Sequence, residues 1–134
     1  MNDADKEKRI TQLRKGILEL AVMGTLYHEH HYGYSLARVL SGNGEISLKE
    51  GTIYPILTRL AREGLVQSQW VESDQGPPRK YYFLTGNGRR LFEQLMPDFD
   101  QLVSLVKQSR NRKGNRSADG PGERISIRKG ENHD

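Results

Sequence analysis

The side chains best suited to chemistry lie between residues 49 and 62, and the chemistry that they favour is the binding of nucleic acid. On a helical wheel, Ile53, Leu57 and Leu60 share one apolar face, and the opposite face is polar and cationic. Arginine donates a rigid fork of hydrogen bonds to guanine edges and phosphates, and Thr and Tyr hydroxyls suit phosphate oxygens. The candidate residues on this face and its flanks are Thr52, Tyr54, Thr58, Arg59 and Arg62. An ordinary amphipathic helix with solvated arginines shows the same pattern, so this segment alone leaves both interpretations open.

A second pair of cations, Arg79 and Lys80, directly follows the turn Gly76-Pro77-Pro78. Because this turn is stiff, two cations at its base can reach a DNA backbone or a neighbouring minor groove. Two solvated strand residues are the simpler interpretation when the pair is taken alone.

Three histidines crowd one short polar stretch, at His28, His30 and His31. Imidazole is a good ligand for Zn and Ni, so a metal-responsive protein is one hypothesis. Three ligands on one turn make an incomplete site, to which only the distant His133 would add a fourth. We therefore favour a solvated turn, and we expect no metal and no cofactor.

Enzymatic chemistry has little support in this sequence. The chain has no cysteine, which excludes thiol nucleophiles and disulfides, and it has no glycine loop of phosphate-binding form. Its Ser and His residues have no defensible spacing with an orienting acid. No apolar run approaches the ~20 residues of a membrane helix, and the charged start does not resemble a secretory signal. We expect neither an enzyme nor a membrane protein.

The elements that must position these residues follow from hydrophobic periodicity and turn signals. Ser47 and Glu50 fit a capping box, Gly64 fits a left-handed helix end, and Pro55 suggests a bend. Helices are predicted over 10–28, 33–40 and 47–63, strands over 65–71 and 79–84, and a last helix after a cap at Thr85. This order, mostly α with a two-stranded β-wing, is that of a winged helix-turn-helix. In that fold the second and third helices form the helix-turn-helix, and the third helix enters the major groove of DNA.

The last helix carries an apolar seam with nearly heptad spacing, which predicts a dimer contact. Pro97 lies inside this helix and predicts a kink near Met96. The first and last helices together supply the predicted dimerisation residues, which are Leu13, Ile17, Leu91, Leu95, Phe99, Leu102 and Val106. The predicted organisation is a disordered tail over 1–9, a winged helix-turn-helix domain over 10–84, a dimerisation helix over 85–110 and a disordered basic tail over 111–134.

The charge of the chain is unevenly distributed. Its 134 residues suit a single domain, and its net charge is +4. Acidic and basic side chains balance within residues 1–106, so the whole excess falls on 107–134. If the folded part binds DNA, it must use locally placed charges, and the tail would add only sequence-independent affinity or serve solubility.

Five motifs occur in a fixed order between residues 11 and 106. They are Leu13-Arg14-Lys15-Gly16-Ile17-Leu18, Tyr32-Gly33-Tyr34-Ser35-Leu36, Glu50-Gly51-Thr52-Ile53-Tyr54-Pro55, Glu63-Gly64-Leu65-Val66 and Gly76-Pro77-Pro78-Arg79-Lys80-Tyr81-Tyr82. In these motifs the sequence resembles the PadR family of bacterial transcriptional regulators, in the short-chain branch with a single C-terminal dimerisation helix. The resemblance implies a homodimer that binds double-stranded operator DNA, usually as a repressor.

The same resemblance implies roles for individual residues. Tyr34 and Tyr54 would touch phosphates, while Lys49, Thr52 and Arg59 would enter or flank the groove. Arg79 and Lys80 would serve the wing. In some relatives, aromatic residues of the last helix and the wing line a pore for flat apolar effectors, and the corresponding candidates are Trp70, Phe92, Met96 and Phe99. We favour the simpler interpretation that these four belong to the dimer core.

These observations predict a cytoplasmic, homodimeric winged-helix repressor that reads a palindromic operator through its third helix and its wing. The alternatives are a small-molecule-sensing or metal-sensing dimer whose ligand relieves repression, and an interaction module with weak DNA binding. Substitution of Arg59 by alanine separates these classes, because only a DNA reader would lose sequence preference.

Overall fold

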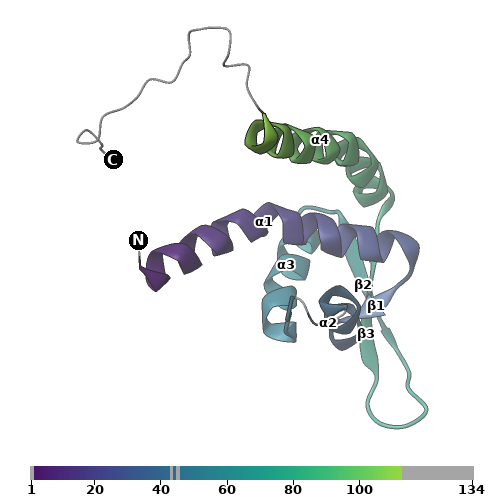
Figure 1. Cartoon of the computed structure of the whole chain (residues 1–134). Coiled ribbons are helices and arrows are strands. Elements are labelled where there is room, and N and C mark those ends of the chain that lie inside the picture. The colour runs from purple at the N-terminus through teal and green to yellow at the C-terminus, as the bar shows by residue number, and fades with distance from the viewer. Residues whose placement is uncertain (1, 43, 45, 113–134) are drawn as a thin grey trace, which may run out of the picture. The chain divides into compact units, whose positions relative to one another are not determined.

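The computed structural model describes residues 2–42, 44 and 46–112, and its elements follow the predicted order with one addition. Of the tail predicted over 111–134, residues 113–134 lie outside the described residues, and Asn111 is the last residue of the final helix. The elements are α1 (Asp3–His28), β1 (His31–Tyr32), α2 (Gly33–Ser41), α3 (Glu50–Arg62), β2 (Val66–Val71), β3 (Arg79–Leu84) and α4 (Gly86–Asn111). The protein is mostly α-helical with one small antiparallel sheet, as the sequence predicts (Figure 1). None of the described helices has the length and apolar character needed to cross a membrane.

The chain forms two compact units that divide between Leu95 and Met96, inside α4. In the first unit, α1 lies across α2 and α3, and the sheet lies beside them (Figure 1). Apolar side chains from every one of these elements meet in one core, because each helix is amphipathic and the sheet has one apolar face. The most deeply buried side chains are Val22, Leu26, Leu36, Ile53, Leu57, Leu60 and Val66.

The sheet has three strands rather than the two predicted. The added strand β1 has only two residues and pairs with β3, with His31 opposite Tyr82 and Tyr32 opposite Tyr81. β3 is therefore the central strand, in the order β1-β3-β2. A two-residue strand leaves no periodic signal in the sequence, which is why the polar stretch before α2 is predicted as a turn.

The first helix begins earlier than predicted. Residues 3–9, expected to be disordered, form the first turns of α1, and the Asn2 side chain accepts a hydrogen bond from the Asp5 backbone N–H at 2.9 Å. An N-cap asparagine and acids in the first turn both favour a helix start. Apolar periodicity does not predict this early start, because residues 3–9 are polar or charged apart from Ala4.

The third helix begins later and ends where predicted. Ser47 does not cap it; Lys49 is the N-cap residue, and the helix starts at Glu50. The reason lies in Leu48, which is buried and exchanges two hydrogen bonds with the Ser41 hydroxyl, so the chain stays extended past Ser47. At the other end, Gly64 has φ +77°, as predicted for a left-handed helix end.

The last helix starts as predicted and continues through Pro97 to Asn111. The Thr85 hydroxyl accepts a hydrogen bond from the Gly88 N–H at 3.0 Å and donates one to the Gly64 carbonyl at 2.7 Å. Gly88 is buried against the Leu65 carbonyl, and a β-carbon there would overlap this oxygen. The glycine-rich start of the helix therefore permits a close approach between helix and strand.

Candidate nucleic-acid interface

The outward side of α3 is a polar stripe spaced at one helical turn. Gly51, Pro55, Thr58 and Arg62 are all exposed, and their spacing of four, three and four residues places them on one line along the helix. The opposite side is fixed in the core by the buried side chains Ile53, Ile56, Leu57 and Leu60. A helix held by one apolar face and free on the other has the form that major-groove insertion requires.

Arg59 lies off this stripe, on the side of α3 that faces α1. Its Nε hydrogen is donated to a carboxylate oxygen of Glu19, with an N···O distance of 2.6 Å, and both side chains are about two-thirds covered. The sequence predicts Arg59 as a groove residue, but in the structure its guanidinium is already partnered. Such a partner must be displaced or shared before Arg59 can bind a base or a phosphate.

A groove of about 960 Å³ runs between α1 and α3. Thr52, predicted to flank the DNA groove, lines it together with Arg59. Three further cations from α1, Lys8, Arg14 and Lys15, and one acid, Glu7, line the same groove. The charged side chains that line the groove between α1 and α3 are therefore mostly cationic, and most of these cations belong to α1.

A second groove, of about 630 Å³, lies between α2 and the start of α3. It brings together Tyr34 and Lys49, both predicted as DNA-binding residues from separate motifs. It also contains Arg38, which the sequence analysis missed, and the acid Glu50. The signal that was available is spacing, since Arg38 follows Tyr34 by four residues and so lies on the same side of α2.

Tyr54 crosses from α3 onto the start of α2. A β-carbon at Gly33 would overlap the Tyr54 phenol, so the close approach of the two helices depends on this glycine. Tyr54 is 43% exposed and Tyr34 is 50% exposed, so both phenols are accessible, as phosphate contacts require. Burial raises the pKa of Tyr82, which lies deeper in the sheet, and the neighbouring Tyr54 phenol adds to this effect.

The two predicted cations of the wing lie on opposite faces of β3. Arg79 stacks over the Tyr32 ring, with 4.6 Å from Cζ to the ring centroid, on the face away from the core. Lys80 lies on the other face, 5.9 Å from the centroid of Trp70, its cross-strand partner. Successive strand residues alternate faces, so the structure brings Arg79, and not Lys80, together with the tyrosines of β1 and α2.

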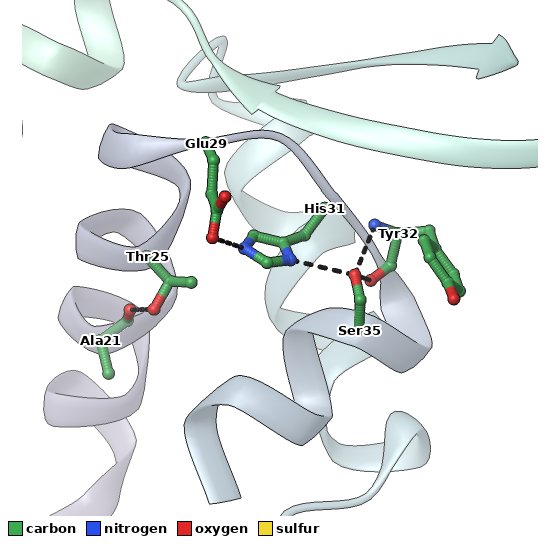
Figure 2. A network of polar contacts seen from close by, with 6 residues as sticks. All are labelled: Ala21, Thr25, Glu29, His31, Tyr32 and Ser35. Carbon is green, nitrogen blue, oxygen red and sulfur yellow. Dashed lines mark hydrogen bonds and ion pairs between the residues drawn. The ribbon is translucent and has the colours of Figure 1, made fainter. Parts of the chain in front are cut away.

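Of the three histidines, His31 is buried and the other two are exposed. The His31 ring nitrogens lie 3.0 Å from the Ser35 hydroxyl and 3.1 Å from a Glu29 carboxylate oxygen (Figure 2). Within the described residues, no group of three or more His, Cys, Asp or Glu side chains is arranged to hold a metal ion. His31 instead links the end of α1 to the start of α2.

The four predicted pocket residues do not form one cluster in the first unit. Phe92 packs on Tyr27, with ring centroids 5.4 Å apart, and a β-carbon at Gly24 would lie 3.1 Å from the Phe92 ring. Trp70 is 66% exposed on the wing, while Met96 and Phe99 belong to the second unit. Beside Phe92, the Tyr27 hydroxyl donates a hydrogen bond to the Glu93 carboxylate. This bond raises the pKa of Tyr27, and the nearby charge of Arg89 offsets only part of the rise.

A family model and several solved structures that resemble this chain all belong to one family. The family model described as the transcriptional regulator PadR-like family matches residues 20–94. A PadR-like transcription factor from Bacteroides fragilis is 39% identical, covers 76% of this chain and 98% of its own, and superposes with a TM-score of 0.64. A PadR family transcriptional regulator from Eggerthella lenta is 31% identical, and the match covers 83% of this chain and 96% of that one with a TM-score of 0.70. Bacillus subtilis PadR, solved in complex with operator DNA, shares the fold at 21% identity. The match covers 70% of this chain and 60% of that one, with a TM-score of 0.55.

Proposed function

Because the chain belongs to the PadR-like family, it is a DNA-binding transcriptional regulator rather than an enzyme, and we propose that it acts as a homodimeric repressor on a palindromic operator. Such a regulator works where the DNA is, which in a bacterial cell is the cytoplasm. The observation that carries the proposal is the exposed stripe of α3, in which Thr58 and Arg62 stand on a helix held by its apolar face. The α3 helix enters the major groove, and the predicted contacts to base edges come from this stripe.

Dimer formation is supported by apolar side chains that the described residues of one chain leave exposed. Leu13 is 68% exposed on α1, and Leu102 and Val106 are 60% and 64% exposed on α4. Long exposed apolar rows on helices of a small protein are typical of association surfaces. In a two-fold dimer the two α3 helices would enter successive major grooves about 34–36 Å apart.

The experiment that tests this function is selection of bound duplexes from a random DNA pool at two salt concentrations. We expect enrichment of an inverted repeat whose half-sites lie one helical turn apart. Retention of DNA at low salt without any enriched sequence would contradict it, since charge alone would then account for the binding.

The basic residues of the predicted tail would add sequence-independent affinity. Removal of residues 113–134 should make the dependence of affinity on salt less steep while the enriched sequence stays the same. An unchanged salt dependence would mean that these cations do not contact phosphates.

A second candidate function is the binding of a flat apolar effector that relieves repression. The observation that favours it is the exposure of Trp70, a large apolar ring that is 66% exposed in the described part of the chain. Trp70 is the only tryptophan of the sequence, so quenching of intrinsic fluorescence by planar aromatic compounds reports directly on this residue. Quenching that is unaffected by saturating operator DNA would weaken the link between ligand and repression.

A further inference from the structure

Four aromatic and cationic side chains form a ladder between the wing and α2. Arg79 stacks over Tyr32 at 4.6 Å, and Tyr32 stacks on Tyr34 with ring centroids 6.3 Å apart and an interplanar angle of 28°. Arg38 lies over the far end of the ladder, 5.8 Å from the Tyr34 centroid. We call these residues, Arg79, Tyr32, Tyr34 and Arg38, the arginine–tyrosine ladder.

The register of the sheet explains the wing end of the ladder. Tyr32 is the cross-strand partner of Tyr81, and the two rings meet edge to face at 5.2 Å. Arg79 precedes Tyr81 by two residues, so it lies on the same face of β3 and reaches the Tyr32 ring diagonally. The short strand β1 therefore places an aromatic ring under a wing arginine.

The backbone of Tyr32 is itself held in place. The Ser35 hydroxyl accepts a hydrogen bond from the Tyr32 N–H at 3.2 Å and donates one to the Tyr32 carbonyl at 3.0 Å (Figure 2). Buried His31 contacts the same hydroxyl. Tyr32 thus has little freedom at its backbone, which makes its ring a fixed platform.

The other end of the ladder opens into the groove at the start of α3. Arg38 and Tyr34 line this groove with Lys49, the N-cap residue of α3, and with Gly51 of the exposed stripe. Glu50 is the acid of this groove. The ladder therefore connects the wing, α2 and the beginning of α3 along one surface.

A stacked guanidinium keeps its donors available. The ring beneath it contacts the face of the guanidinium, while the N–H groups point outward in the plane and can form hydrogen bonds to a phosphate. Stacking also removes rotamer freedom before DNA arrives, so less entropy is lost on binding. Neither Arg38 nor Arg79 is in an ion pair among the described residues, unlike Arg59.

We propose that Arg38 is a further phosphate-binding residue and that Tyr32 is the residue that positions Arg79 for the same task, so that the ladder is one backbone-binding surface of the DNA complex. This proposal rests on the proposed function, because it concerns the same DNA. Its ligand is the phosphodiester backbone, so its contribution is independent of base sequence.

The test measures affinity for a selected operator and for a random duplex over a range of salt, with the full chain. Arg38→Gln should weaken both equally and make the slope of log affinity against log salt shallower by about 0.9, the value for one phosphate. The matched control is Arg90→Gln, an exposed arginine of α4 outside the ladder, which should change the slope far less. Equal slopes for wild type and Arg38→Gln would overturn the role of Arg38.

The positioning role of Tyr32 is tested by coupling. Tyr32→Phe keeps the ring and should bind like wild type, whereas Tyr32→Leu should lose about as much affinity as Arg79→Gln, and the double variant little more than either. Additive losses would overturn the positioning role, as would a loss in Tyr32→Phe equal to that in Tyr32→Leu. Arg79→Lys keeps the charge but lacks the planar guanidinium that stacks on Tyr32, so we expect this variant to lose affinity for DNA. Because the substitution does not change β1, this loss can be measured even if Tyr32→Leu does not fold. If the wild-type chain itself binds no DNA, the proposed function fails, and this outcome is distinct from a normal wild type with silent ladder variants.

Discussion

Arg59 of α3 donates a hydrogen bond to Glu19 of α1 across forty residues of sequence, with an N···O distance of 2.6 Å. The pair joins the helix that carries the exposed stripe to the longest helix of the first unit. It also places a carboxylate at the groove between α1 and α3, where a DNA phosphate would compete for the same guanidinium. We therefore expect Arg59 to hold α3 against α1 in the free protein and to contact DNA only when Glu19 is displaced or shared.

Glu19→Gln should raise the affinity for DNA, because it removes the carboxylate that competes for Arg59. The cost in stability should be small, about 0.2–1 kcal/mol, since the pair is only partly covered. Fluorescence anisotropy with operator DNA measures the first effect, and thermal unfolding measures the second. The control is Glu63→Gln at the exposed C-cap of α3, because Glu63 carries the same charge and forms no ion pair with another described residue. Equal gains in both variants would mean that only net charge matters.

Arg62→Ala should reduce discrimination between operator and random DNA by about 1–3 kcal/mol if Arg62 reads a base edge. Thr58→Ala should have a smaller effect of the same kind, because a hydroxyl makes fewer bonds. Competition binding with operator variants changed at one base pair locates the contact. A uniform loss on all sequences would assign Arg62 to phosphate rather than to a base.

Gly33→Ala should destabilise the first unit by about 1–3 kcal/mol, because the added methyl overlaps the Tyr54 phenol and overpacks the contact of α2 with α3. Chemical denaturation measures the loss, and Tyr54→Leu in the same chain should restore part of it. Gly16→Ala, in α1 with nothing within 4 Å of the new methyl, should instead stabilise by about 0.5–1 kcal/mol. A Gly33→Ala variant as stable as wild type would show that Tyr54 can turn away without cost.

Leu102→Glu should weaken self-association, because it puts a charge on an exposed apolar row of α4. We expect sedimentation to shift from dimer toward monomer and operator affinity to fall, while the unfolding of the first unit changes little. Gln108→Glu adds the same charge at an exposed polar position of the same helix and should leave the dimer intact. A dimer that survives Leu102→Glu would move the interface to other residues.

Much of the fold is predictable from the sequence, and the reasons are local. β3 spans Arg79–Leu84 as predicted, because the aromatic run Tyr81-Tyr82-Phe83, which favours a strand, lies shortly after a strong turn. Gly64 ends α3 as predicted, since the left-handed conformation there suits glycine best. The polar stripe of α3 follows from its helical period alone.

The errors share a different origin. The early start of α1 depends on a cap and charges rather than on apolar period, and the late start of α3 depends on Ser41, which binds Leu48 from the end of α2. His31 shows the same limit, because a histidine in a polar stretch is predicted to be solvated and is instead buried by pairing with β3.

The sequence by itself determined the order of the elements, the division of α3 into an apolar and a cationic face, and the presence of a cation-bearing wing, because each depends on the spacing of neighbouring residues. Only the tertiary structure decided which of these cations are available for DNA. Arg59 is tied to Glu19, Arg79 rests on Tyr32 while Lys80 leaves by the other face, and Arg38 joins Lys49 at one groove. The Arg59–Glu19 and Arg79–Tyr32 contacts join residues at least forty positions apart in the chain, and such contacts are set by how the helices and the sheet pack rather than by any local pattern.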